Sequence, residues 1–314
     1  MRVAFLGTAE FAVPTLRGLL ESDHEVVGVV TGPDKPAGRG RRLRPTPVKR
    51  VAEAAGLPLL TPSRLKDPAF LADFASRRPD VAVVVAFRIL PRELFTLPPH
   101  GTLNVHPSLL PRYRGPAPVN WALINGERET GVSIIRISET VDAGGLLLQE
   151  KVAVDPLETA GELAARLASL GAMMTLRALE GLAEGSLVPL PQDDSLVTRA
   201  PKLVKEDGRI DWSRSALEVH NRVRGVDPWP GAYGTLSGRM LKLFRSRPLE
   251  HPSGQPGEIL EAGGELVVAC GAGAVAFAEV QLAGKKRMQV SDFLRGFRLA
   301  VGARFESVVE GGDG

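Results

Sequence analysis

The sequence predicts an α/β fold with a Rossmann-like, doubly wound and mostly parallel sheet, followed by a small C-terminal β-barrel of the OB-fold type. In the first half of the chain, short apolar runs alternate with segments whose apolar residues recur at helical spacing. The run at 81–87 (V-A-V-V-V-A-F) is almost entirely apolar, which is typical of a parallel strand buried on both faces. Beyond residue 207, short strands alternate with glycine-rich turns, which favours a small barrel.

The length of the chain and a change in its pattern indicate two domains. The 314 residues exceed the usual size of one domain. The stretch at 188–206 lacks clear periodicity and contains three prolines, which is typical of a linker. We therefore expect an N-terminal domain over residues 1–187, this linker, and a C-terminal domain over residues 207–314.

The expected elements of the N-terminal domain alternate between strand and helix. Apolar runs predict strands at 2–6, 25–31, 81–87, 102–105 and 131–137, and amphipathic spacing predicts helices at 11–20 and 47–55. Thr159 and Glu162 form a capping-box pattern, so a long helix is expected to begin there and to stop near Gly185.

The expected elements of the C-terminal domain are shorter. A helix at 215–224 is followed by a break at Pro228–Gly231. The expected strands are 233–236, 239–246, 257–260, 265–270 and 274–281, and one or two helical turns are expected at 291–297.

Composition excludes several classes of protein. The single cysteine, Cys270, cannot form a disulfide within the chain, and it makes a cysteine-based metal site very unfavourable, so we expect no metal. No apolar run is long enough to cross a bilayer. Because the first residues lead directly into an apolar strand pattern rather than a signal peptide, we expect a cytoplasmic protein.

Basic residues are concentrated between residues 34 and 50. The net charge of +3 does not by itself indicate a nucleic-acid partner. Within this segment Asp34 is the only acid, and the bases are Lys35, Arg39, Arg41, Arg42, Arg44, Lys49 and Arg50. The loop expected at residues 32–45 is either a solvated charged surface or a long functional loop whose arginines bind phosphates.

Candidate reactive side chains follow the expected strand at 102–105. The sequence from Asn104 to Pro118 is N-V-H-P-S-L-L-P-R-Y-R-G-P-A-P, and in an extended chain Asn104 and His106 point to the same face. An amide donates hydrogen bonds without titrating, and an imidazole exchanges protons near neutral pH. Asp142, in D-A-G, either belongs to an ordinary turn or orients His106 and raises its pKa. Together these groups would suit transfer of an acyl or formyl group through a tetrahedral oxyanion.

The sequence lacks the signatures of two other classes of enzyme, those with a nucleophilic serine or cysteine and those that bind a nicotinamide cofactor. There is no G-x-S-x-G or Cys–His signature that would supply a nucleophile. The turn after the first strand, Gly7–Phe11, lacks the G-x-G-x-x-G fingerprint, which argues against a nicotinamide enzyme.

The motif at 104–118 and the later D-A-G resemble those of the 10-formyltetrahydrofolate-dependent formyltransferase superfamily, in particular its members that act on initiator methionyl-tRNA. The resemblance covers nearly the whole chain and includes Phe5–Thr8, Pro33–Gly40, Glu129–Val132, Arg209–Trp212, Pro228–Pro230 and Ala283–Lys286. It implies 10-formyltetrahydrofolate as co-substrate, charged initiator tRNA as acceptor and a monomeric protein. It also implies that the barrel domain binds tRNA.

The same resemblance implies roles for individual residues. The implied catalytic residues are Asn104, His106 and Asp142. The implied folate-binding residues are Phe87, Arg88, Ser108, Leu109, Leu110 and Pro111. The implied tRNA-binding residues are Arg39, Arg41, Arg42, Lys202 and Lys205. The segment at 85–91 is one residue shorter than the family pattern, next to the expected pterin site.

Three other functions remain open from sequence alone. A formyltransferase for a small amine would share the catalytic residues but would not need the basic loop or this C-terminal domain. A folate hydrolase would use water as the acceptor. An RNA-binding module without enzymatic activity would explain the basic residues but not Asn104, His106 and Asp142.

Overall fold

The chain folds as two compact units, and the computed structural model describes residues 1–37, 42–251 and 254–306. The first unit comprises Met1–Gly115, Thr130–Val152 and Ala164–Ala200. The second comprises Pro116–Glu129, Ala153–Leu163 and Pro201–Gly314. The second unit therefore includes two short segments that precede the linker in sequence, and the boundaries at 187 and 206 stay a prediction.

A seven-stranded sheet in the order β5-β2-β1-β6-β7-β8-β9 forms the centre of the first unit. The parallel strands are β1 (Arg2–Gly7), β2 (Glu25–Val30), β5 (Leu59–Leu60), β6 (Val81–Val85) and β7 (Thr102–His106). β8 (Glu129–Arg136) runs antiparallel to β7, and β9 (Gly145–Ala153) lies at the edge. All five residues of β6 are buried, as its apolar sequence predicts. This mostly parallel sheet confirms the predicted Rossmann-like fold.

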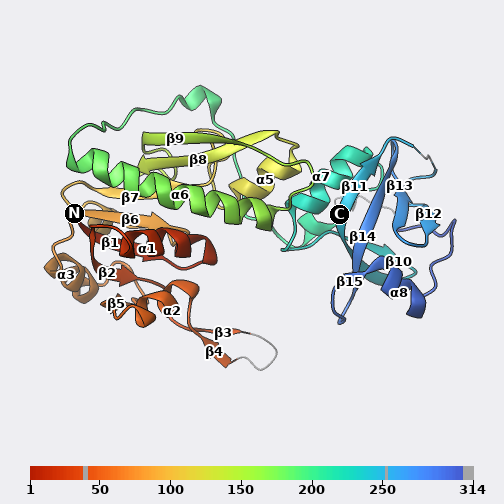
Figure 1. Ribbon diagram of the computed structural model, residues 1–314, viewed down its shortest axis with the longest axis horizontal. Coiled ribbons are helices and arrows are strands. Elements are labelled where there is room, and N and C mark those ends of the chain that lie inside the picture. Colours follow the sequence, from red (N-terminus) through yellow and green to blue (C-terminus); the bar gives the residue numbers. More distant parts are fainter. Residues whose placement is uncertain (38–41, 252–253, 307–314) are drawn as a thin grey trace, which may run out of the picture. The chain divides into compact units, whose positions relative to one another are not determined.

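Helices cover both faces of this sheet. Figure 1 shows α1 (Val13–Leu20) and α6 (Ala160–Ala183) on the near face. A Cβ on Gly171 of α6 would lie 2.7 Å from Cγ1 of Val105, so glycine permits the close approach of this helix to β7. Alternate residues of β1 and β6 face the other way, where they form a cluster with phenylalanines and leucines of α3 (Pro68–Ser76) and α4 (Arg92–Phe95).

Part of the expected basic loop at residues 32–45 belongs to two short strands. β3 (Lys35–Ala37) pairs antiparallel with β4 (Arg42–Arg44), so these six residues are in strands rather than in a loop. α2 (Pro47–Ala54) follows, and Thr46 caps it by accepting a hydrogen bond from the Lys49 backbone. Lys49 Nζ lies 2.8 Å from Asp34 Oδ1, which ties the start of the hairpin to α2.

The second unit contains an antiparallel sheet in the order β10-β11-β14-β13-β12. Its strands are β10 (Tyr233–Leu236), β11 (Arg239–Leu249), β12 (Ile259–Ala262), β13 (Leu266–Ala269), β14 (Ala274–Leu282) and β15 (Met288–Gln289), which pairs with β14. In the described part of this unit the sheet is accompanied by α5 (Pro118–Ile124), α7 (Ala216–Gly225) and α8 (Val290–Gly296). The curled antiparallel sheet confirms the predicted OB-like C-terminal domain.

An aromatic cluster fills the core of the second unit. The Trp212 ring lies 6.1 Å from that of Phe277, at a near-perpendicular angle, and 5.0 Å from that of Phe305. Cys270 is buried in the same core, where desolvation raises its pKa to about 12. The thiol therefore stays protonated near neutral pH and acts as a small core residue.

The predicted capping box at the start of α6 is confirmed. The Thr159 backbone donates to Glu162 Oε2 at 2.9 Å, and the Glu162 backbone donates to Thr159 Oγ1. Arg245 adds an ion pair, with Nη2 2.7 Å from Glu162 Oε1. Arg245 and then Thr159 lower the pKa of Glu162 to about 2.

Glu162→Gln is expected to make the second unit less stable, with an acid dependence set by this carboxylate. The ionised Glu162 carboxylate stabilises the folded state. This stabilisation is fully present above the unfolded-state pKa of 4.5 and is lost as pH falls toward about 2. Because Glu162 is 47% exposed, we expect a difference below about 1 kcal/mol in the free energy of unfolding at pH 7. Urea unfolding followed by tryptophan fluorescence measures it, since Trp121, Trp212 and Trp229 all belong to this unit. Glu184→Gln, one residue beyond the end of α6, is the control and should leave the free energy of unfolding at pH 7 unchanged.

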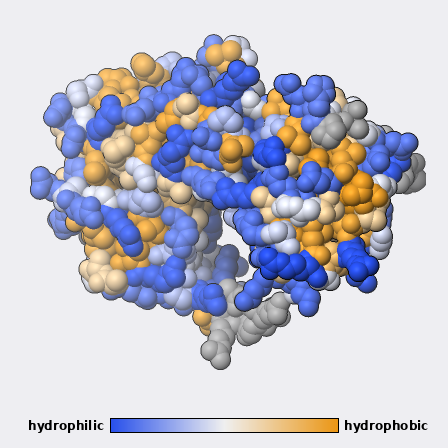
Figure 2. Space-filling model, turned by 45° about the vertical axis from the view of Figure 1, so that its right-hand side comes forward, coloured by the Kyte–Doolittle hydropathy of each residue, from blue (hydrophilic) through white to orange (hydrophobic). Residues whose placement is uncertain are grey.

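On the face shown in Figure 2, hydrophilic residues cover most of each unit, and hydrophobic residues reach the surface only in patches. No helix in the described ranges is long and apolar enough to cross a membrane.

Candidate active site

His106 ends β7 at the carboxyl edge of the parallel strands, where α/β sheets bind their ligands. The residue is 4% exposed. Nε2 lies 3.0 Å from the backbone carbonyl oxygen of Tyr113. A carbonyl can only accept, so Nε2 carries a proton and Nδ1 is the nitrogen that can gain or lose one.

Asp142 lies in the turn between β8 and β9, and it brings a carboxylate to this imidazole. Its Oδ1 is 3.7 Å from His106 Nδ1, and its Oδ2 accepts a hydrogen bond of 2.9 Å from the Gly115 backbone. The backbone of Asp142 is left-handed, with φ of 57°. Aspartate tolerates this conformation better than most residues because its short polar side chain can hydrogen-bond locally.

Burial has the largest effect on the pKa of His106 and therefore on its charge at neutral pH. Desolvation lowers its pKa below the usual 6.5, and this effect outweighs the nearby Asp142 carboxylate and the Tyr113 hydrogen bond, which both raise it. The carboxylate thus acts in the expected direction, but the net shift is downward. At neutral pH the resting imidazole is neutral, with Nδ1 able to accept a proton and Asp142 placed to stabilise the resulting cation.

Asn104 lies two residues before His106 on β7, so its side chain projects from the same face of the strand. It is half-buried. Within the described part of the chain, its side-chain amide makes no hydrogen bond. An amide that is partly shielded from water and has no protein partner is free to donate to a ligand.

The turn after β7 is held by its own polar groups. Ser133 Oγ donates to the Ser108 carbonyl at 2.6 Å and accepts from the Leu110 backbone at 3.1 Å. Gln149 Nε2 donates to the Leu110 carbonyl at 2.9 Å. Ser108 is fully buried, and its hydroxyl donates to the Arg112 carbonyl. In this state the hydroxyl of Ser108 is therefore committed to the turn.

The other predicted folate residues lie in two places. Leu110 and Pro111 are buried in this turn, and Leu109 is half-buried there. Phe87 and Arg88 follow β6, the neighbour of β7. The Arg88 guanidinium donates to the carbonyls of Pro62 and Ser63 and lies 5.2 Å from the centre of the Phe87 ring.

The predicted tRNA residues are separated along the chain. Arg39 and Arg41 lie outside the described residues, and the backbone of Arg42 belongs to β4. Lys202 and Lys205 are exposed residues of the second unit.

Sequence reasoning missed the residues that support Asp142. Gln192, in the segment predicted to be the linker, donates from Nε2 to the carbonyls of Asp142 and Gly144, each at 2.8 Å. Its Oε1 accepts from the buried Arg114. Gly115 is required as well, because a Cβ there would lie 2.4 Å from the Ala200 carbonyl oxygen. No periodicity or motif marks Gln192, so the sequence carried no signal for it.

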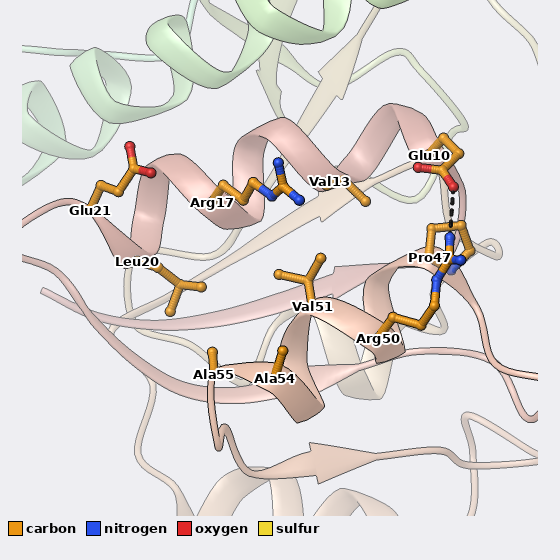
Figure 3. A pocket seen from close by; sticks show the side chains of 10 residues that line it. All are labelled: Glu10, Val13, Arg17, Leu20, Glu21, Pro47, Arg50, Val51, Ala54 and Ala55. Carbon is orange, nitrogen blue, oxygen red and sulfur yellow. Dashed lines mark hydrogen bonds and ion pairs between the residues drawn. The ribbon is translucent and has the colours of Figure 1, made fainter.

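A separate cavity of about 600 Å³ lies between α1 and α2. Figure 3 shows Arg17 and Arg50 on its opposite walls, with Arg50 paired to Glu10 at 3.0 Å. None of Asn104, His106 and Asp142 lines it. It contains two arginines, two glutamates and an apolar floor, so its charges balance and it offers no acid–base pair for group transfer. In residues 1–37, 42–251 and 254–306, no cluster of three histidine, cysteine or acidic side chains could hold a metal ion.

Comparison with known families identifies the class of protein. A model described as formyl transferase matches residues 1–179, and one described as formyl transferase, C-terminal domain, matches residues 202–298. The chain belongs to the formyl transferase family.

Two relatives within that family align with nearly the whole chain. The chain is 48% identical over 304 residues to the methionyl-tRNA formyltransferase of Citrifermentans bemidjiense, covering 96% of this chain and 95% of the relative. It is 47% identical over 306 residues to the methionyl-tRNA formyltransferase of Geobacter sulfurreducens, covering 97% and 96%.

Solved structures share the fold at lower identity. HypX from Aquifex aeolicus in complex with tetrahydrofolic acid is 23% identical, with a TM-score of 0.67. That match covers 94% of this chain and 47% of HypX, so the chain spans about half the length of HypX. An N-formyltransferase from Helicobacter canadensis, in complex with folinic acid and dTDP-3-aminofucose, is 16% identical, with a TM-score of 0.68. That match covers 88% of this chain and 98% of the other.

Proposed function

We propose that this protein transfers the formyl group of 10-formyltetrahydrofolate to the amino group of methionyl-initiator tRNA, for translation initiation. The observation that carries the proposal is the His106–Asp142 pair beside the Asn104 amide, which has no hydrogen-bond partner among the described residues. The acceptor is supported by the methionyl-tRNA formyltransferases that align with almost all of this chain. The donor is supported by the folate complexes of structures with the same fold.

Asn104 stabilises the oxyanion in this proposal. The neutral amine attacks the formyl carbon, a carbon–nitrogen bond forms, and the carbonyl oxygen becomes negatively charged. Nε2 of His106 already donates to the Tyr113 carbonyl, and Nδ1 of the neutral ring has no proton to donate, so the Asn104 amide is the donor available for that charge. One such donor contributes about 10²–10³ in rate.

His106 and Asp142 move the proton. The attacking nitrogen becomes acidic as its new bond forms, and Nδ1 of the neutral imidazole accepts the proton. Asp142 stabilises the imidazolium at 3.7 Å, while the Tyr113 carbonyl keeps the ring oriented. The proton then passes to N10 of folate as the carbon–nitrogen bond to the donor breaks, which leaves tetrahydrofolate and formylated methionyl-tRNA.

The proposal assigns the rest of the chain to binding. Residues 1–187 form the catalytic domain, 188–206 the linker and 207–314 the tRNA-binding domain of a cytoplasmic monomer. Phe87, Arg88 and the turn at 108–111 surround folate. The proposed tRNA contacts are Arg39, Arg41, Arg42, Lys202 and Lys205.

One assay separates this proposal from its rivals. The protein is incubated with 10-formyltetrahydrofolate and with charged initiator tRNA, with free small amines, or with no acceptor. Formyl transfer to the charged tRNA alone is expected. Transfer mainly to small amines, release of formate without an acceptor, or RNA binding without any transfer would each replace the proposal with one of the other functions.

Lys202→Ala and Lys205→Ala are each expected to weaken tRNA binding in a salt-dependent way. If each lysine contacts one phosphate, its loss reduces the slope of log Kd against log salt by about one. Filter binding of charged tRNA at several salt concentrations measures the slope. Lys66→Ala, which removes an exposed lysine paired with Glu93, is the control and should leave the slope unchanged. Slopes equal to that of the unmodified protein would remove both residues from the tRNA site.

A further inference from the structure

The segment predicted to be the linker is hydrogen-bonded at two places, first to β9 and then to the loop that contains Tyr113 and Arg114. The backbone of Leu190 exchanges two hydrogen bonds with that of Leu146, at 2.7 and 2.8 Å. Further along, Thr198 Oγ1 accepts from the Tyr113 backbone at 2.8 Å, and its carbonyl accepts from the Arg114 backbone at 3.0 Å. The segment between these attachments is therefore part of the first unit rather than an independent connection.

Gln192 lies between the two attachments and joins the turn of Asp142 to the loop of Tyr113. Nε2 donates to the carbonyls of Asp142 and Gly144, and Oε1 accepts from Arg114 Nε at 3.1 Å and from Nη2 at 2.7 Å. A guanidinium cannot accept hydrogen bonds, so Arg114 fixes which end of the amide is oxygen. All the hydrogen-bonding groups of the Gln192 amide are thus directed at these two loops.

Arg114 is the hydrogen-bond donor at the centre of this junction. The residue is 6% exposed, and a buried guanidinium requires partners for its donors. Gln192 supplies one acceptor, and Asp194 Oδ1 supplies another at 2.8 Å. Both partners come from the linker. The neighbouring residue Gly115 donates its backbone N–H to Asp142 Oδ2, so this loop contacts the Asp142 carboxylate directly and the Asp142 backbone carbonyl through Gln192.

We propose that Gln192, held by Arg114, is a positioning residue that keeps Asp142 in its left-handed turn and its carboxylate facing His106. The inference rests on the proposed function for its effect on rate, but its effect on His106 is independent of any substrate. Asp142 is the charged group that acts on the His106 pKa, so a displaced Asp142 changes the titration of the ring.

Two substitutions distinguish the hydrogen bonds that Gln192 accepts from Arg114 from those that it donates to the carbonyls of Asp142 and Gly144. Gln192→Met preserves the length of the side chain but removes every hydrogen bond. Gln192→Glu still accepts from Arg114 but cannot donate to the carbonyls of Asp142 and Gly144. Ser195→Ala is the matched control on the same segment, because the Ser195 hydroxyl bonds only to Asp193 among the described residues.

The first measurement is an NMR titration of the His106 ring in the full-length protein without substrate. The protein has five histidines, and His106→Gln identifies the signal. Because Asp142 raises the His106 pKa, Gln192→Met is expected to shift the His106 midpoint to lower pH. Ser195→Ala should keep the original midpoint. An unshifted midpoint in folded Gln192→Met would overturn the proposal.

The second measurement is formyl transfer to charged tRNA. Both Gln192 variants are expected to lose about 10- to 100-fold in kcat, as is typical when the partner that orients a reactive group is removed. The KM values for both substrates should stay within about two-fold, since ground-state contacts are unchanged. If Gln192→Met does not fold, Gln192→Glu decides the question. Gln192→Glu is also measured together with Asp142→Asn. If Gln192→Glu lowers kcat by the same factor whether residue 142 is aspartate or asparagine, the proposal is overturned, because the two residues then act independently.

The two measurements separate failure of this inference from failure of the proposed function. If the unmodified protein does not formylate charged tRNA, the proposed function is wrong, and the His106 titration still tests whether Gln192 positions Asp142. If it does formylate tRNA and the Gln192 variants match it in both measurements, only the positioning role is wrong.

Discussion

Asn104→Ala is expected to lower kcat for formyl transfer by about 10²–10³-fold, because it removes a donor aimed at the developing oxyanion. The loss should appear in kcat rather than in KM for tRNA, since the negative charge exists only in the transition state. The side chain makes no hydrogen bond within the described part of the chain, so its removal leaves no protein group unpaired and stability should change little. Single-turnover kinetics at saturating substrate measure the effect.

Asn104→Asp is the companion variant. It keeps the shape of the side chain but replaces the amide donors with oxygens, and its negative charge would oppose the oxyanion. Its loss should therefore equal or exceed that of Asn104→Ala. Turnover of either variant within a few-fold of the unmodified protein, with the fold intact, would remove Asn104 from the reaction.

Asp142→Asn and His106→Gln are each expected to lower kcat by about 10²–10⁴-fold, the usual contribution of acid–base catalysis by a positioned side chain. Since the carboxylate acts through the imidazole, the double variant should lose little more than the worse single variant. Glu139→Gln is the control, because this exposed carboxylate near Asp142 pairs only with Arg92 among the described residues. Losses that multiply in the double variant would show that the two residues do not act as a pair.

The pH profile gives the same pair a second test. His106 must be neutral to accept a proton, and burial lowers its pKa below 6.5, so His106 should contribute an acid limb to kcat/KM below that value, separate from the limb caused by protonation of the acceptor amine. Asp142 raises the His106 pKa, so the residual activity of Asp142→Asn should fall at a still lower pH. An acid limb above pH 6.5 that is unchanged by Asp142→Asn would assign it to another group.

Most of the fold could be predicted because its signals are local. The apolar run of β6 and the capping box of α6 each depend only on residues that are close together in the sequence, and both have the expected structure. β9 was not predicted, since its residues alternate between half-buried and exposed positions at the edge of the sheet. The β3–β4 hairpin was missed for a related reason, because a basic, proline-containing segment carries little strand signal.

The candidate site could be predicted only in part. Asn104 and His106 are two residues apart on one strand, so strand geometry alone places them together. Asp142 is 36 residues beyond His106, and only the family resemblance distinguished it from an aspartate in an ordinary turn. Gln192 is more distant still and acts through hydrogen bonds to backbone carbonyls, which no sequence pattern encodes. The net pKa of His106 also depended on burial, which only the folded structure reveals.

The central claim is that the formyl carbon reacts between Asn104 and the His106–Asp142 pair. A crystal structure with 5-formyltetrahydrofolate, a stable analogue of the proposed donor, tests it most directly. We expect the formyl oxygen about 2.7–3.2 Å from the Asn104 amide nitrogen, the usual range for such a hydrogen bond. We also expect the formyl carbon on the side of the ring that faces Asp142. A ligand bound in the cavity between α1 and α2, or with its formyl group directed away from Asn104 and His106, would contradict the account.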